Sequence, residues 1–111
     1  MELTTEVLSK FVGGVMEISN RVENHHYMGK IQEIEVKDGM LIVKFHWLIK
    51  KNGRQWKKVS PISYLGNLKI CNLSDIGRDR LFICIPVVEE TSILYLPTDS
   101  KLNQVEVLRT S

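Results

Sequence analysis

Five of the nine residues in KKNGRQWKK, which spans residues 50–58, are basic, and a tryptophan lies among them. Lys and Arg side chains on a β-ribbon can follow a phosphate backbone, and a neighbouring aromatic ring can stack on a base. The segment therefore raises the hypothesis of a nucleic-acid contact. The alternative is a hydrated turn, because lysine at hairpin tips and strand edges also protects sheets against edge-to-edge aggregation.

The charge around this segment is unevenly distributed along the chain. Residues 39–74 contain seven Lys or Arg residues and no Asp or Glu, although the whole chain of 111 residues has a net charge of only +2. Such an uneven charge distribution is evidence about the kind of partner that the protein binds, and it does not bear on the fold. The residues that we expect to contact nucleic acid are Lys44, His46, Lys50, Lys51, Arg54, Lys57 and Lys58.

A β-hairpin within residues 27–49 comes directly before the basic segment. Asp38-Gly39 separates two β-rich runs there, and Asp-Gly suits the positive φ angles of a two-residue type I′ turn. The register that follows places Val36 opposite Leu41, and turn chemistry and hydrophobic alternation agree on it. Its core face is expected to carry Met28, Ile34, Val36, Leu41, Val43, Phe45, Trp47 and Ile49.

The Asn-Gly pair at 52–53 predicts a second hairpin, whose tip is the basic segment itself. If Lys51 pairs with Arg54, Trp56 lies opposite Ile49 and turns toward the core. The basic patch would then lack an aromatic side chain for stacking.

The remaining segments complete a mainly β chain. Thr4 and Thr5 can cap a short helix that runs to about Phe11 and is terminated by Gly13-Gly14. Further strands are expected over residues 68–73, 81–88, 93–96 and 105–108, with SDIGRDR as the loop between the first two. We therefore expect one domain over residues 1–111: a small antiparallel β-barrel of six to eight short strands with a short N-terminal helix.

Two stretches resemble known families. YMGKIQEIEVKDGMLIVKF, residues 27–45, resembles the second and third strands of an SH3-like or Tudor-like barrel. In a Tudor-like module an aromatic cage holds a cationic side chain, and Tyr27 with Trp47 is the pair available here. NLSDIG, residues 72–77, matches (D/N)-x-S-x-x-G and so resembles the cyclic-dinucleotide-binding PilZ barrels. The R-x-x-x-R motif with which that family clamps guanines and phosphates does not occur in this sequence.

The sequence contains no catalytic, cofactor or phosphate-loop motif of the G-x-S-x-G, G-x-G-x-x-G or GK[ST] kind. His25 and His26 are adjacent, point in divergent directions, and are expected in a solvated loop rather than at a metal. Cys71 and Cys84 lie in apolar strands and are expected to be buried, reduced and inert. We therefore expect no enzyme, no cofactor and no metal site.

These observations predict a non-enzymatic binding module that contacts RNA or DNA through the basic hairpin. The alternative is a protein-interaction or scaffold domain, which could self-associate as a homodimer through an open sheet edge. A PilZ-like cyclic-dinucleotide binder is a third hypothesis. No apolar run approaches the roughly 20 residues that span a bilayer, and the N-terminus lacks signal-peptide features, so we expect a cytoplasmic protein without a membrane partner.

Overall fold

The computed structural model describes residues 3–77 and 79–110. Its elements in chain order are α1 (Thr5–Ser9), β1 (Val15–Asn20), β2 (His25–Lys37), β3 (Met40–Asn52), β4 (Gln55–Val59), β5 (Tyr64–Asn67), β6 (Asn72–Gly77), β7 (Arg80–Ile85), the 3-10 turn η1 (Pro86–Val88), β8 (Glu90–Tyr95) and α2 (Lys101–Thr110). The expectation of a mainly β chain with a short N-terminal helix is confirmed. Among the described residues, no helix is long and apolar enough to cross a membrane.

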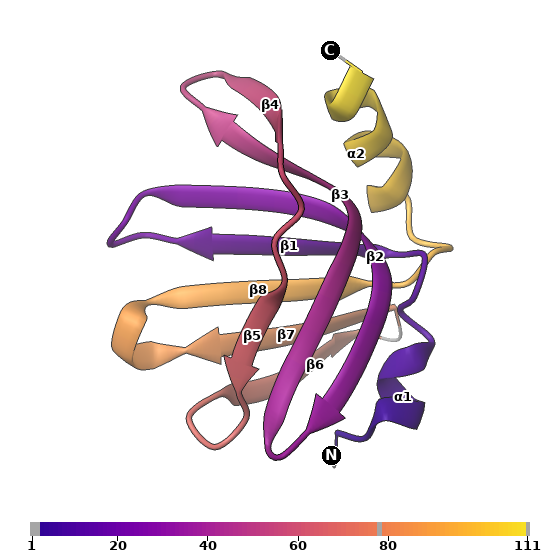
Figure 1. Cartoon of the computed structure of the whole chain (residues 1–111), viewed down its shortest axis with the longest axis vertical. Coiled ribbons are helices and arrows are strands. Elements are labelled where there is room, and N and C mark those ends of the chain that lie inside the picture. Colours follow the sequence, from indigo (N-terminus) through magenta and orange to yellow (C-terminus); the bar gives the residue numbers. More distant parts are fainter. Residues whose placement is uncertain (1–2, 78, 111) are drawn as a thin grey trace.

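The eight strands form one curled antiparallel sheet. Their order is β4-β3-β2-β1-β8-β7-β6, and β5 pairs with β3. Figure 1 shows that β3 and β5 lie in front of β6, β7 and β8, so the sheet folds over on itself. Within the described residues no pairing joins β6 to β4 or β5. The sheet therefore stays open, and the closed barrel that the strand pattern predicted is not confirmed.

The hairpin of β2 and β3 begins as the sequence predicts. Asp38 and Gly39 have φ angles of 53° and 75°, as a type I′ turn requires. The ladder next to the turn has the expected register, and it brings Glu33 opposite Lys44 with 3.6 Å between their charged groups. Turn chemistry acts over a few residues, which is why this part of the register can be derived from sequence.

Two irregularities then interrupt this ladder. Gln32 on β2 and His46 on β3 each have no partner on the opposite strand of the hairpin. Because side chains alternate with a period of two, one extra residue turns the rest of a strand to the other face. Phe45 therefore joins one hydrophobic cluster and Trp47 another. The prediction that Met28, Trp47 and Ile49 share a core face with Phe45 is wrong.

Two hydrophobic clusters pack on the two faces of the sheet. The inner cluster lies within the curl and includes α1; its buried members are Leu8, Phe11, Met16, Ile31, Ile34, Leu41, Val43, Phe45, Leu48, Tyr64, Leu81, Ile83 and Leu94. The outer cluster packs beneath α2 and comprises Val15, Met28, Trp47, Ile49, Tyr95 and Val105. One open sheet thus supports a core on each side.

The second hairpin has a different register from the expected one. Asn52 pairs with Gln55, which leaves Gly53-Arg54 as the loop. Gly53 has a φ of 65°, and a glycine with positive φ at the first loop position is typical of a type II′ turn. The expected pairing of Lys51 with Arg54 is therefore wrong.

The C-terminal half departs from the strand prediction at three places. NLSDIG forms β6 and so extends into the expected loop, whereas residues 68–70 form a turn rather than a strand. The strand expected over residues 81–88 ends at Ile85, and residues 86–88 form η1, because Pro86 cannot donate to a ladder. Residues 105–108 lie in α2. Leu102, Val105 and Leu108 all pack on the outer cluster at helical spacing, and this packing outweighs the short apolar run that suggested a strand.

Candidate nucleic-acid interface

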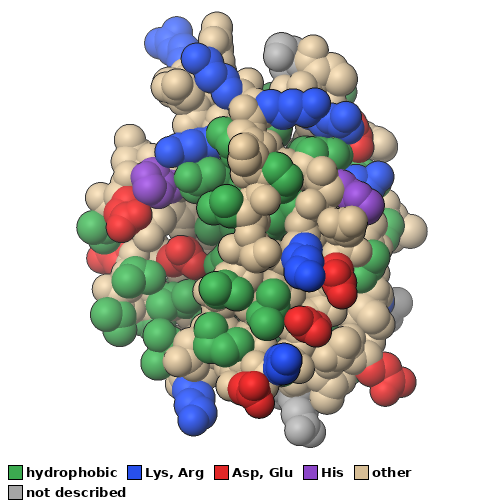
Figure 2. All heavy atoms as spheres, viewed as in Figure 1, with side chains coloured by type: hydrophobic (Ala, Val, Ile, Leu, Met, Phe, Trp, Pro, Cys, Tyr) green, Lys and Arg blue, Asp and Glu red, His purple; other side chains and the backbone are tan. Residues whose placement is uncertain are grey.

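A cleft of about 420 Å³ lies between the tips of the β1–β2 and β3–β4 hairpins. We call it the lysine cleft; its lining residues are Asn24, His25, Lys50, Lys51, Asn52, Gly53, Lys57, Lys58 and Val59. Four of these are lysines and none is acidic. Figure 2 shows Lys and Arg side chains gathered at this end of the molecule, above a surface richer in hydrophobic side chains.

Two of the lysines face each other across the ladder. Lys50 on β3 pairs directly with Lys57 on β4. Like charges in directly opposed positions destabilise an antiparallel pair. None of the four cleft lysines forms an ion pair with any residue that the structure describes. The four lysines therefore lack ion-pair partners among the described residues, and a bound anion would relieve the repulsion between Lys50 and Lys57.

Tyr27 provides an aromatic surface beside the lysine cleft. The Lys50 Nζ atom lies 5.4 Å from the centre of the Tyr27 ring, within the range of a cation–π contact. The His25 ring meets the same tyrosine edge-on, with 5.9 Å between ring centres, and its Nδ1 atom lies 3.3 Å from the Glu23 carboxylate. The aromatic ring that contacts a cleft lysine thus comes from β2, outside the basic segment.

Neither tryptophan is available to this cleft. Trp56 lies opposite Lys51, not Ile49, and is half-buried against the outer cluster. Its ring contacts the edge of the His26 ring, with 4.9 Å between centres. Trp47 is 8% exposed in the outer cluster, whereas Tyr27 packs against the inner one, so the two do not form the aromatic cage that a Tudor-like module would need.

The structure brings together only part of the expected contact set. Lys50, Lys51, Lys57 and Lys58 line the cleft, and Arg54 lies in the adjoining loop. The other two expected residues, Lys44 and His46, do not line it.

Their positions on β3 explain why. Lys44 lies between two inner-cluster residues, so its side chain faces outward, where it pairs with Glu33. His46 is the exposed residue of the β3 irregularity. Lys57 is two residues from Val59, which packs on the inner cluster, so Lys57 and Lys44 lie on opposite faces of the sheet.

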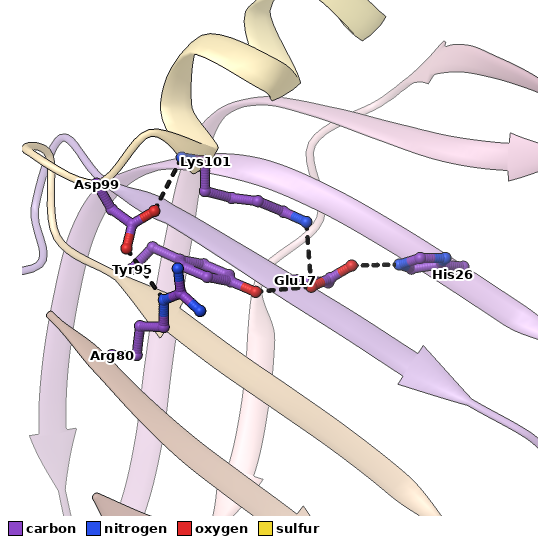
Figure 3. Close-up of polar contacts among 6 residues, drawn as sticks. All are labelled: Glu17, His26, Arg80, Tyr95, Asp99 and Lys101. Carbon is purple, nitrogen blue, oxygen red and sulfur yellow. Dashed lines mark hydrogen bonds and ion pairs between the residues drawn. The ribbon is translucent and has the colours of Figure 1, made fainter. Parts of the chain in front are cut away.

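A second polar constellation surrounds Glu17 on the outer face (Figure 3). Its carboxylate lies 2.7 Å from His26 Nε2, accepts a hydrogen bond of 3.0 Å from the Tyr95 hydroxyl, and lies 3.5 Å from Lys101 Nζ. The hydrogen bond with His26 is the largest influence that lowers the pKa of Glu17, to about 2; Lys101 and Tyr95 act in the same direction, whereas burial opposes them. The sequence reasoning did not single out Glu17.

Arg80 and Asp99 extend this constellation toward the start of α2. The Arg80 side chain donates to Asp99 at 3.1 Å, and Asp99 also accepts from the Lys101 backbone N–H at 2.9 Å. Arg80 and Lys101 both lie over the Tyr95 ring, at 5.3 and 5.4 Å from its centre. Because these contacts hold the side chains of α2 and the sheet to one another, we interpret the constellation as an anchor for the helix.

The adjacent histidines diverge, as expected, but they do so from the first residues of β2 rather than from a loop. His25 contacts Glu23 and Tyr27, whereas His26 contacts Glu17 and Trp56. In the part of the chain that the structure describes, no three His, Cys, Asp or Glu side chains are arranged to hold a metal ion.

Both cysteines are free thiols and half-buried rather than fully buried. Cys84 pairs with Asn72, the residue next to Cys71. The Cys71 thiol donates to the Asn67 carbonyl at 3.0 Å, and burial raises the pKa of this thiol. A raised pKa lowers the thiolate fraction and hence the reactivity of Cys71.

Comparison with known proteins does not identify a relative. No protein-family model matches the chain, and no curated protein or solved structure shows a significant match to it.

Proposed function

We propose that this protein is a non-enzymatic binding module that contacts single-stranded RNA or DNA through the lysine cleft. The observation that carries the proposal is the opposed pair Lys50 and Lys57, which has no acidic partner among the described residues. A cleft between two hairpin tips can follow a phosphate backbone, and Tyr27 supplies a ring against which a base can stack. The cytoplasmic location is part of the same proposal.

The test is fluorescence anisotropy with short labelled RNA and DNA oligonucleotides across a salt series. Each phosphate contact with a single strand contributes a slope near −0.7 in log affinity against log salt, so four lysines predict a slope of about −3. Lys57→Glu should weaken binding and flatten this slope. The same change places opposite charges across the ladder, so the melting temperature should stay the same or rise.

Lys69→Glu is the matched control, because it changes the net charge equally at an exposed turn residue that does not line the cleft. We expect this variant to retain nearly all of the affinity and the full slope. Absence of saturable binding at low salt, or an equal loss in both variants, would contradict the proposal.

A protein-interaction or scaffold function is the second candidate, and the open sheet favours it. β6 is a terminal strand of the sheet order, and five of its six residues are exposed. Such an edge can pair with a strand of a second copy, which would produce a homodimer. A molecular mass determined by light scattering over a concentration series distinguishes this candidate, because pairing of edges does not depend on nucleic acid.

The two family resemblances remain interpretations of short segments. The hairpin of β2 and β3 contains the segment whose sequence resembles an SH3-like or Tudor-like barrel. We take this resemblance as support for a binding module. NLSDIG, the PilZ-like segment, forms β6, and none of its residues lines the lysine cleft. A cyclic dinucleotide is therefore useful as a competitor in the anisotropy experiment rather than as the leading ligand.

A further inference from the structure

A second cavity of about 180 Å³ opens on the inner face of the sheet. We call it the inner cavity; its lining residues are Ile18, Tyr27, Phe45, Leu48, Ile62, Ser63, Tyr64, Leu65 and Glu90. Most of them are apolar or aromatic, and Glu90 is the one acidic member of the set. A cavity of about 150 Å³ can hold one benzene ring, so this one has room for a single small ring system.

The inner cavity exists because the pairing along one side of β3 is interrupted between β4 and β5. Both β4 and β5 pair with β3 in one continuous register, with Leu48 opposite Val59 and Val43 opposite Tyr64. The four residues between them, 60–63, form no strand. Pro61 lies in this segment and has no N–H to donate to a ladder, which is why the pairing with β3 is interrupted there.

Two buried hydroxyl groups near this cavity are unsatisfied. The Tyr64 hydroxyl and Ser92 Oγ have no hydrogen-bond partner among the described residues, although these residues are only 8% and 1% exposed. Burial raises the pKa of Tyr64, and both Ser92 and Glu90 are close enough to influence that pKa without forming a hydrogen bond of good geometry. Burial likewise raises the pKa of Glu90. An unsatisfied buried polar group costs free energy, so a ligand that supplies its partner gains affinity.

The inner cavity adjoins the lysine cleft. Tyr27 lines the cavity, and its ring forms a cation–π contact with Lys50, which lines the cleft. Leu48 lines the cavity and is paired with Val59, which lines the cleft. Leu48 and Lys50 are two residues apart on one strand and hence about 7 Å apart on the same face. The phosphate and the base of one nucleotide are separated by a single sugar and can reach both positions.

We propose that the inner cavity accepts one nucleobase of the strand whose phosphates occupy the lysine cleft, an inference that rests on the proposed function. The apolar walls and the Tyr27 ring contact the faces of the base, as aromatic side chains do in other single-strand binders. Glu90 accepts hydrogen bonds from the edge of the base. Guanine carries a ring N–H and an amino group side by side on that edge, which matches the two oxygens of a carboxylate, so guanine is the preferred base.

The test uses oligouridine pentamers whose central nucleotide is guanine, uracil or abasic, measured across a salt series. We expect the guanine oligomer to bind about tenfold more tightly than the abasic one, since stacking of a base on an aromatic side chain has an effect of this order. Glu90→Gln should remove most of the preference for guanine over uracil and leave the salt slope unchanged. Glu89→Gln, at the exposed neighbouring residue, is the matched control and should retain the preference.

Tyr64→Phe provides a second measurement, and its expected result differs from the one expected if the Tyr64 hydroxyl had only a structural role. Because the hydroxyl has no partner in the free protein, its removal should leave the melting temperature unchanged or raise it, and should weaken binding of the guanine oligomer only. Salt-dependent binding with equal affinity for guanine and abasic oligomers would overturn this inference and leave the proposed function intact. No binding to any oligomer at low salt would overturn both.

Discussion

The Glu17 carboxylate lies within 3.5 Å of side-chain donors from three elements: His26 on β2, Tyr95 on β8 and Lys101 on α2. Its own side chain is only 17% exposed. A carboxylate in this setting is stabilised in its charged form, which is why its pKa is lowered to about 2 although burial acts in the opposite direction.

This lowered pKa predicts how the stability of the protein depends on pH. A carboxyl group with a folded-state pKa below the unfolded value stabilises the fold above the unfolded pKa of about 4.3, and this contribution is lost as the pH falls toward the folded pKa. Between pH 5 and pH 2 the free energy of unfolding should therefore fall by about 1–3 kcal/mol more in the wild type than in Glu17→Gln. Urea denaturation at several pH values measures the difference.

Glu89→Gln serves as the control for this measurement, because Glu89 is exposed and forms no ion pair with a described residue. Its stability should follow the wild-type pH dependence. If Glu17→Gln also follows the wild type, the Glu17 constellation does not hold the helix in the way that we infer.

At the scale of elements, the β2–β3 hairpin depends on its two-residue turn. Gly39→Val should destabilise the protein by about 1–3 kcal/mol, because a β-branched residue resists the φ of 75° found there. Thermal melting measures the change. Gly77→Val is the control, since Gly77 lacks a positive φ and an added Cβ there would meet no other atom within 4 Å. Similar losses in the two variants would remove the turn assignment.

The irregularities at Gln32 and His46 lie in the same hairpin, but no local sequence pattern predicts them. Because one residue is skipped on each strand, the register is restored, and Met28 still pairs with Ile49 as the sequence predicts. The residues beyond the irregularities nevertheless lie on the opposite face of the sheet from the one predicted. Residues crowd together around Gly29, where a Cβ would lie only 2.7 Å from the Phe45 ring. Glycine has no Cβ and so avoids this clash. Packing between distant segments, rather than propensity, decides where such a bend occurs.

At the scale of the whole molecule, one open sheet carries a core on each face, and α2 covers the outer one. Trp47 is central to this outer core, and the Arg109 guanidinium of α2 lies 5.1 Å from its ring centre. Trp47→Ala should cost about 3–5 kcal/mol and reduce the hydrogen-exchange protection of the α2 amides.

Trp56→Ala provides the comparison, because Trp56 is only half-buried at the margin of the same cluster. We expect a distinctly smaller loss of stability for this variant, measured by urea denaturation. A Trp47→Ala protein with unchanged protection in α2 would show that the helix does not depend on the outer core.

Part of the candidate interface could be derived from the sequence. The basic residues at 50, 51, 57 and 58 stand out by composition, and they do line one cleft. Lys44 and His46 do not join them, because the irregularity in β3 and the alternation of faces separate them from Lys57. Asn24 and His25, which complete the cleft, come from another hairpin and had no local pattern to connect them with the lysines.

The sequence by itself determined the local features of this protein: the Asp38-Gly39 turn, the register beside it, the capped helix α1 and the basic tip of the second hairpin. Each depends on side chains and backbone angles within a few residues, so the pattern contains the answer. Only the tertiary structure decided that the sheet stays open, that Trp47 belongs under α2, and that Tyr64 and Glu90 meet at a cavity beside the lysines. These outcomes depend on how segments far apart in the chain pack together, and on desolvation that exists only once they have done so.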